Sequence, residues 1–177
     1  SAGNEGDTYF ITGSPGVATR AIATASVMDS GEAGVALSVN APPAIAATYP
    51  AAPSSYTDTV PPVPQPSGET ADVVAALDPA DGSGSLTTDA CSALTNAAAV
   101  AGNLALVDRG TCGFVVKVLN CQAAGAIGVI VADNVVGDPV PAGMGGAAAG
   151  DITIPALRVS KATGDLIRAQ LALPAVV

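Results

Sequence analysis

The chain has 177 residues, with six lysines and arginines against fifteen aspartates and glutamates, which gives a formal net charge of −9 at pH 7. This acidic balance disfavours nucleic acid and anionic membrane surfaces as partners, because both repel a negatively charged chain. Hydrophobic residues make up 49% of the chain and charged residues only 12%, which argues against a wholly disordered polypeptide.

The first part of the chain, up to about residue 103, predicts short strands separated by irregular segments. One strand is predicted over Val35–Val39 and another over Val73–Leu77. Between them, residues 50–66 carry a cluster of prolines, which lack the amide donor that a sheet ladder needs. We therefore expect residues 50–66 to form an extended, exposed crossing rather than a central strand.

The best-patterned stretch, residues 104–134, predicts a strand, a turn, a helix and a second strand. Leu104–Val107 is a short apolar run. Apolar residues then recur at helical spacing from Phe114 to Gly125, a residue type common at helix ends. Residues 127–131 are apolar without alternation, as expected for a strand covered on both faces. No nucleophile, base or metal cluster lies in this unit, which favours a recognition or scaffolding module over a catalyst.

The last part of the chain predicts a long loop and a closing helix. The loop, residues 133–151, is rich in glycine and proline and follows a strand, where binding groups often lie. The helix begins at Ser160, an N-cap candidate, and is expected to turn Leu166, Ile167 and Leu171 inward.

Several of these motifs occur in an order that resembles the protease-associated (PA) domain. They are the Asp108-Arg-Gly-Thr-Cys112 turn with the helix and strand after it, the glycine-rich segment 138–146 and the segment 152–160. The resemblance is clear from about Cys91 to Leu171 and weaker back to about Gly34. It implies an α+β fold, a PA-domain-like mixed β-sheet or open barrel flanked by two main α-helices and long loops. We therefore expect a PA domain over residues 31–177.

Residues 1–30 are expected to form a separate flanking segment. The motif Ser1-Ala-Gly-Asn-Glu-Gly6 and the segments 13–16 and 20–27 follow an order that resembles the part of a subtilisin-like serine protease that carries the oxyanion-hole asparagine. The resemblance implies that Asn4 matches that asparagine, whereas the alternative is a polar turn. The chain contains no histidine and lacks the Gly-Thr-Ser-Met segment expected around the nucleophile, so it cannot complete a Ser-His-Asp triad.

The chain has three cysteines, an odd count. Cys112 precedes the predicted helix and Cys121 lies well along it, so roughly 13 Å of helical rise separates them, too far for a direct bridge. We prefer a disulfide between Cys91 and Cys112, with Cys121 as a buried thiol, and the pair Cys91–Cys121 stays open. A disulfide favours a secreted protein, which the PA resemblance also implies.

The candidate binding residues follow the two predicted strands of the 104–134 unit. Arg109 is a candidate to face a partner's carboxylate or carbonyl, although a structural pairing with Asp108 or a neighbour is favoured. Asp133 and Asn134 open the long loop, and Met144 within it is either an exposed contact or core filler.

Three further observations concern residues without an expected binding role. Gly110 is expected to supply a positive φ, and Lys117 is expected to be solvated or to snorkel. The acidic residues of the loop do not match a regular calcium-binding loop, so no metal and no cofactor is expected.

Together these features predict a non-catalytic PA domain of a secreted subtilisin-like serine peptidase. Its expected partners are a protein or peptide substrate, whose access it guides or restricts, and the peptidase catalytic domain. Two alternatives stay open. One is a self-standing secreted protein-binding PA module, and the other is the PA domain of a zinc peptidase.

Overall fold

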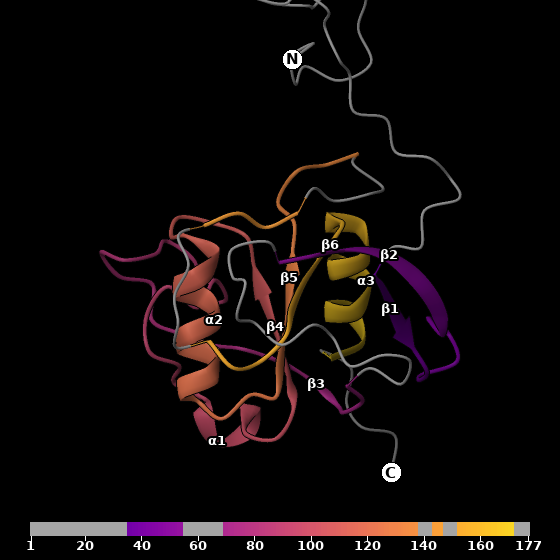
Figure 1. Ribbon diagram of the computed structural model, residues 1–177, viewed down its shortest axis with the longest axis horizontal. Helices are drawn as coiled ribbons and strands as arrows, with labels where there is room; N and C mark the ends of the chain where they lie inside the picture. The colour runs from indigo at the N-terminus through magenta and orange to yellow at the C-terminus, as the bar shows by residue number, and fades with distance from the viewer. Residues whose placement is uncertain (1–34, 55–68, 138–142, 147–151, 172–177) are drawn as a thin grey trace, which may run out of the picture. The chain divides into compact units, whose positions relative to one another are not determined.

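The computed structural model describes residues 35–54, 69–137, 143–146 and 152–171 (Figure 1). All of them lie in the unit Gly34–Val177. The predicted flank 1–30, which includes Asn4, lies outside the described residues, as does the proline-rich segment from residue 55 onward.

The described residues of this unit form one mixed sheet of six strands, in the order β1-β2-β6-β5-β4-β3. The four strands from β3 to β6 pair in parallel, whereas β2 is antiparallel to both β1 and β6. This topology confirms the predicted α+β fold with a mixed sheet. The strands are β1 Ala36–Val39, β2 Ala47–Pro53, β3 Val73–Ala75, β4 Leu104–Asp108, β5 Gly128–Ala132 and β6 Ala156–Val159.

In the part of the chain that the structure describes, three helices accompany the sheet: α1 Ala97–Val100, α2 Phe114–Ala123 and α3 Lys161–Leu171. The two longer helices, α2 and α3, lie on opposite sides of the parallel strands (Figure 1). None of the described helices is long and apolar enough to cross a membrane.

Strand periodicity divides the core between the two faces of the sheet. Ala105 and Val107 of β4 pack with residues of α2, whereas Leu106 between them packs on the other face with Ile167 of α3. All five residues of β5 are buried, which confirms the prediction of a strand covered on both faces.

Helix α2 has the predicted ends. It begins at Phe114 and buries Val118 and Cys121 against the sheet. Its last turn is closed by the amide of Gly125, which donates to Gln122 O at 2.9 Å. Gly125 has φ +85°, a conformation that a side chain disfavours, so glycine is required at this helix end.

Helix α3 confirms the predicted cap but not the whole predicted buried face. The amide of Thr163 donates to Ser160 Oγ at 3.2 Å, which makes Ser160 the N-cap. Thr163, Gly164 and Ile167 are the buried residues of the helix. Leu166 and Leu171 remain 38% and 39% exposed, because the close approach of α3 to the sheet is centred on Gly164 rather than on the leucines.

The expectation of an exposed crossing from Pro50 is wrong for residues 50–53, which belong to β2 and lie between β1 and β6. Ala51 and Ala52 are buried. The amide of Ala51 donates to Val35 O on the β1 side. Successive backbone nitrogens of a strand point to opposite neighbouring strands, so the nitrogen of Pro50 faces β6 and that of Pro53 faces β1. Pro50 lies just before the β2–β6 register begins and Pro53 lies beyond the end of the β1–β2 register. Neither proline therefore removes a ladder hydrogen bond.

Candidate functional site

Two of the candidate binding residues, Arg109 and Asp133, lie side by side at the carboxyl edge of the parallel strands. Arg109 directly follows β4 and Asp133 directly follows β5, two neighbouring strands of the sheet. Arg109 Nη1 donates to Asp133 Oδ1 at 2.9 Å. Arg109 therefore makes a structural ion pair, which was the favoured expectation, and its partner Asp133 directly follows the neighbouring strand.

The carboxylate of Asp133 is the centre of a larger clamp, because Arg158 of β6 donates to its second oxygen. The amides of Asn134 and Val135 also donate to Oδ1, at 2.7 and 3.2 Å. Burial acts to raise the pKa of Asp133. The hydrogen bonds from Arg109 and Arg158 and from the two amides outweigh burial and lower the pKa to about 2. Asp133 is therefore ionised at neutral pH and joins three consecutive strands at one edge.

The clamp fixes the first residues of the loop after β5. Asn134 is exposed, and Val135 and Val136 are 49% and 81% exposed although their neighbour Asp133 is buried. Two neighbouring valines thus face solvent on a turn whose amides are held by a buried carboxylate. We refer to Asn134, Val135 and Val136 as the valine turn. Its exposed apolar surface next to Arg109 is suited to contact with another protein surface.

Met144 does not belong to this surface. It is fully buried, forms a parallel bridge with Ser54 and donates its amide to Pro53 O at 3.3 Å. Of the two alternatives for this residue, the structure shows core filler and contradicts an exposed contact. The segment 143–146 comes beside β2 beyond the end of the β1–β2 register, and the methionine side chain belongs to the buried cluster on the α2 face of the sheet.

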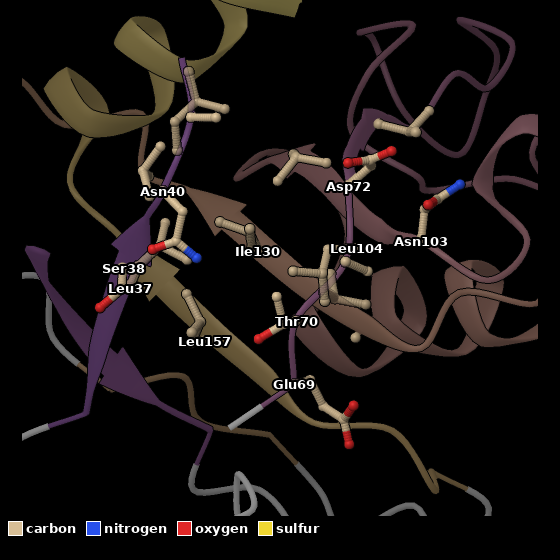
Figure 2. Close-up of a pocket in the computed structure, with 18 of the residues that line it drawn as sticks. Leu37, Ser38, Asn40, Glu69, Thr70, Asp72, Asn103, Leu104, Ile130 and Leu157 are labelled. Atoms are coloured by element: carbon tan, nitrogen blue, oxygen red, sulfur yellow. The ribbon is translucent and has the colours of Figure 1, made fainter. Parts of the chain in front are cut away.

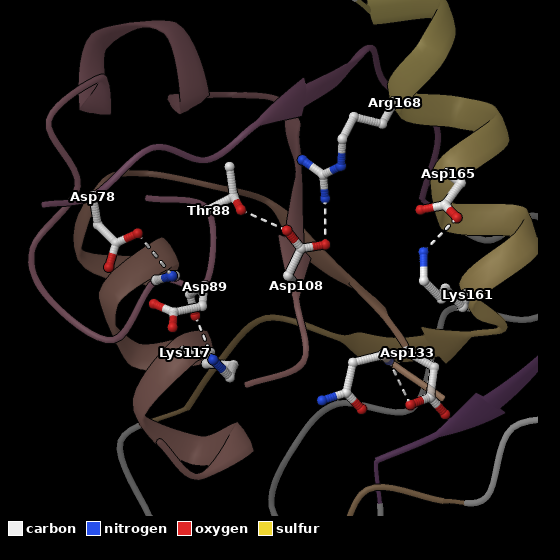
Figure 3. Close-up of polar contacts among 11 residues, drawn as sticks. Asp78, Thr88, Asp89, Asp108, Lys117, Asp133, Lys161, Asp165 and Arg168 are labelled. Carbon is white, nitrogen blue, oxygen red and sulfur yellow. Dashed lines mark hydrogen bonds and ion pairs between the residues drawn. The ribbon is translucent and has the colours of Figure 1, made fainter. Parts of the chain in front are cut away.

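A second polar cluster lies around Asp108, the last residue of β4 (Figure 3). Arg168 of α3 donates to Asp108 Oδ1 at 2.6 Å, and Thr88 Oγ1 donates to Oδ2 at 2.5 Å. Asp108 therefore ties α3 and the segment before α1 to the end of β4, and its described partners do not include Arg109.

Lys117 is fully buried, which contradicts the expectation of a solvated or snorkelling side chain. Its Nζ donates to the carbonyl oxygen of Asp89 at 2.5 Å and lies 3.4 Å from Cys91 Sγ (Figure 3). Burial lowers the pKa of Lys117, and the negative charges of Asp89, Asp78 and Asp108 oppose that shift. The lysine is buried because a loop distant in sequence supplies its acceptor.

Gly110 has a different role from the one expected, since its φ is not in the left-handed region. A Cβ atom there would lie 3.3 Å from Asp89 Oδ2, so glycine allows the buried Asp89 carboxylate to approach the chain.

The structure contains the preferred disulfide, between Cys91 and Cys112, with Cα atoms 5.7 Å apart. Cys121 is a buried free thiol, and burial raises its pKa to about 12. The disulfide holds the segment before α1 against the turn that precedes α2.

The described residues contain no group of three metal-ligating side chains gathered as a metal site. The carboxyl edge of the parallel strands is instead built from ion pairs. Sequence reasoning did not identify Arg158 or Arg168 as members of it, because their partners lie 25 and 60 residues away along the chain. A signal was present for Arg158, since it stands between the apolar residues Leu157 and Val159, and a charged residue that is buried with such neighbours requires a partner.

Comparison with known proteins agrees with this architecture. The aminopeptidase of Pseudomonas aeruginosa is 40% identical over 101 residues, which cover 48% of this chain and 18% of the aminopeptidase. The ER degradation-enhancing alpha-mannosidase-like protein 3 of Xenopus laevis is 43% identical over 84 residues, which cover 44% of this chain and 9% of that protein. The chain therefore spans less than a fifth of the length of either relative.

Among solved structures, a zinc aminopeptidase from Bacillus subtilis shares the fold with a TM-score of 0.50 and 22% identity. The match covers 70% of this chain and 26% of the aminopeptidase. The sequence model of the PA domain matches residues 69–167, more than half of the chain. The chain belongs to the PA domain family.

Proposed function

We propose that this chain is the non-catalytic PA domain of a larger secreted peptidase, where it guides or restricts the access of protein substrates to the catalytic domain. The observation that carries the proposal is the valine turn, which the Asp133 clamp holds in place. An exposed apolar surface on a fixed support is what contact with another protein requires, since little ordering is then needed on binding.

The chemistry of peptide hydrolysis is assigned to the rest of the parent protein. This chain has no histidine, so it offers no imidazole to serve as a general base in a serine-type triad or as a ligand of the kind most catalytic zinc sites use. We expect the isolated chain to leave casein and an acyl-ester substrate intact. Turnover above a blank by pure material would contradict the assignment.

Two kinds of parent peptidase are supported by different observations. The matched relative from Pseudomonas aeruginosa is named an aminopeptidase, which supports an aminopeptidase parent. The motif around Asn4 supports a subtilisin-like serine peptidase, with residues 1–30 as part of the catalytic domain and 31–177 as an inserted PA domain. The reading frame discriminates between them. Histidine- and aspartate-bearing segments before Ser1 and a Gly-Thr-Ser segment after Val177 favour the serine peptidase, whereas an adjoining metal-ligand set favours the aminopeptidase.

A self-standing secreted binding module is the remaining alternative, and a reading frame that encodes only the PA domain supports it. The disulfide Cys91–Cys112 supports an oxidising compartment in every case.

The guiding role is tested in the full-length peptidase with the double substitution Val135→Ser and Val136→Ser. The matched control is Leu86→Ser, which removes an apolar side chain that is 43% exposed in the segment before α1. We expect kcat/KM for a folded protein substrate to change at least threefold in the double variant, while kcat/KM for a short chromogenic peptide stays constant. Equal effects on both substrates, or an equal effect of Leu86→Ser, would refute the role of the valine turn.

A further inference from the structure

A groove of about 1220 Å³ opens on the α3 side of the sheet, between β1 and β3. These are the two outer strands of the sheet, so their lining of one groove shows that the sheet curls until its edges face the same space. Figure 2 shows Leu37, Leu104, Ile130 and Leu157 directed into this space from four different strands. The floor of the groove is therefore apolar.

Among the described residues, no strand pairs with the outer edge of β1, and this open edge runs along the groove. The hydrogen bond from the amide of Ala51 to Val35 O makes these two residues a bonded pair of the β1–β2 ladder. By alternation, the amide and carbonyl groups of Ala36 and Ser38 point away from β2. Both residues line the groove, so β1 presents backbone donors and acceptors to it.

The edge of β3 is partly covered, in contrast. The side chain of Asn96 donates to Ala75 O at 2.8 Å and accepts from the amide of Leu77 at 2.9 Å. One side-chain amide thus substitutes for a neighbouring strand at the end of β3. Asn96 covers β3 beyond the groove, since neither Ala75 nor Leu77 lines it, whereas Val73 does. β1 brings two outward-facing residues to the groove and therefore offers the longer edge for strand pairing there.

The charged side chains among the described residues that line the groove are acidic. Glu69 and Asp72 line it on the β3 side, and none of the described lining residues is a lysine or arginine (Figure 2). The five described basic residues are engaged elsewhere: Arg109 and Arg158 with Asp133, Lys161 with Asp165, Arg168 with Asp108, and Lys117 with Asp89 O. A ligand that complements this groove is apolar and carries positive charge.

We propose that the groove binds an extended, unfolded polypeptide segment that pairs antiparallel with the open edge of β1. Its alternate side chains enter the apolar floor, and a lysine or arginine meets Glu69 and Asp72. Antiparallel pairing is favoured because its ladder is slightly more stable than a parallel one, and strand addition supplies affinity through main-chain hydrogen bonds. This inference deepens the proposed function and rests on it for the identity of the bound segment as part of a protein substrate. Peptide binding itself is a property of this chain and is measured without the rest of the peptidase.

The binding test uses the 177-residue chain and a fluorescein-labelled nonapeptide of alternating valine and serine with a lysine near each end. Fluorescence anisotropy compares it with two peptides, one with glutamates in place of the lysines and one with alternate backbone amides methylated. We expect the lysine peptide to bind at least tenfold more tightly than either. Equal binding of the lysine and glutamate peptides, or full binding of the methylated peptide, would overturn the proposal.

Variants locate the site. Ser38→Pro removes an amide that points away from β2 and so leaves the β1–β2 ladder intact, and it is expected to weaken binding at least tenfold. The pair Glu69→Gln and Asp72→Asn is expected to weaken it at least fivefold, whereas Asp81→Asn with Asp165→Asn removes the same charge outside the groove and leaves affinity within twofold. Circular dichroism and Tm verify that each variant folds. Equal losses from the two double variants would refute the groove as the site.

Two further outcomes separate this inference from the proposed function. If the peptide binds as expected but a full-length peptidase carrying Glu69→Gln and Asp72→Asn hydrolyses protein substrates at an unchanged rate, the groove is supported as a peptide site and its part in guiding substrates is refuted. The guiding role itself is decided by the Val135→Ser and Val136→Ser variant. Absence of peptide binding, together with a dimer of the free chain that Ser38→Pro dissociates in analytical ultracentrifugation, overturns the inference in favour of a second copy as the occupant.

Discussion

Replacement of Asp133 by asparagine tests whether the clamp at the carboxyl edge of the sheet stabilises the fold. Asparagine has nearly the same shape and keeps an acceptor for the amides of Asn134 and Val135, but it removes the charge that Arg109 and Arg158 share. The side chain of Arg158 is only 7% exposed, so its guanidinium would lose its carboxylate partner in a buried setting.

The size of the effect follows from the pKa of Asp133, which is lowered from 3.8 to about 2. A shift of this size corresponds to about 2 kcal/mol of stability at neutral pH. Removal of one partner of a buried ion pair typically costs about 3–5 kcal/mol, because the other charge is left buried. We therefore expect Asp133→Asn to lower the free energy of unfolding by about 2–4 kcal/mol at pH 7.

The pH dependence gives a second check. Since the pKa is lower in the folded state, the stabilisation by Asp133 is fully present above about pH 4 and is lost as the pH falls through about 2. The stability gap between wild type and Asp133→Asn is expected to narrow by roughly 1 kcal/mol between pH 7 and pH 3.

Urea unfolding followed by far-UV circular dichroism measures both quantities. The matched control is Asp165→Asn, which removes the same charge from an ion pair with Lys161 whose side chains are 61% and 37% exposed. Exposed pairs of this kind contribute about 0.3–0.5 kcal/mol. Equal losses in the two variants, or a gap for Asp133→Asn that is constant from pH 7 to pH 3, would refute the clamp.

Three further predictions concern the core. Lys117→Met is expected to lower the free energy of unfolding by about 1–3 kcal/mol, because it leaves the Asp89 carbonyl without its donor. The control Lys161→Met, on the surface of α3, is expected to change it by less than about 0.5 kcal/mol. Equal urea midpoints for the two variants would contradict the buried hydrogen bond. Cys121, with a pKa of about 12, is expected to resist iodoacetamide at pH 8 in the folded chain and to react as the single free thiol in urea without reductant, as mass spectrometry can establish. Gly164→Ala is expected to lower the free energy of unfolding by about 1–3 kcal/mol, since the new Cβ would lie 2.3 Å from Ala132 Cβ. In the control Gly82→Ala, the new Cβ meets no atom within 4 Å. A smaller loss for Gly164→Ala than for Gly82→Ala would contradict the close packing of α3 on β5.

The elements that the sequence predicted best are those whose signals are local. Helix α2 begins at Phe114 and ends before Gly125 as expected, because apolar spacing and the terminal glycine lie within one turn of the residues they describe. The buried strand β5 was predicted from its own uninterrupted apolar run. In both cases the residues that predict the element belong to it or directly adjoin it.

The elements predicted poorly depend on partners far along the chain. The prolines of residues 50–66 were taken to exclude a central strand. Whether the missing amide of Pro50 matters depends on which neighbouring strand its nitrogen faces, and β6 pairs with β2 only from Ala51 onward. Lys117 was expected in water because its acceptor, Asp89 O, lies 28 residues before it. Such long-range contacts cannot be predicted from composition or residue spacing.

The Asp133 clamp and the proposed peptide groove lie on opposite faces of the sheet, because successive residues of a strand point to opposite faces. On β6, Arg158 belongs to the clamp and reaches toward Phe114 of α2, with its guanidinium 5.8 Å from the ring centroid, while its neighbour Leu157 faces the groove. Asp133 shares no hydrogen-bond or ion-pair partner with Glu69 or Asp72 among the described residues.

This separation predicts that the clamp and the groove act independently. Asp133→Asn is expected to lower the stability of the chain yet leave the affinity for the lysine nonapeptide within twofold, measured at a temperature where the variant is fully folded. The pair Glu69→Gln and Asp72→Asn is expected to do the reverse. Their stability effects should add within about 0.5 kcal/mol in the triple variant, because residues without common partners rarely couple more strongly. A loss of peptide affinity in Asp133→Asn as large as that in Glu69→Gln with Asp72→Asn would show instead that the carboxyl edge and the groove form one coupled site.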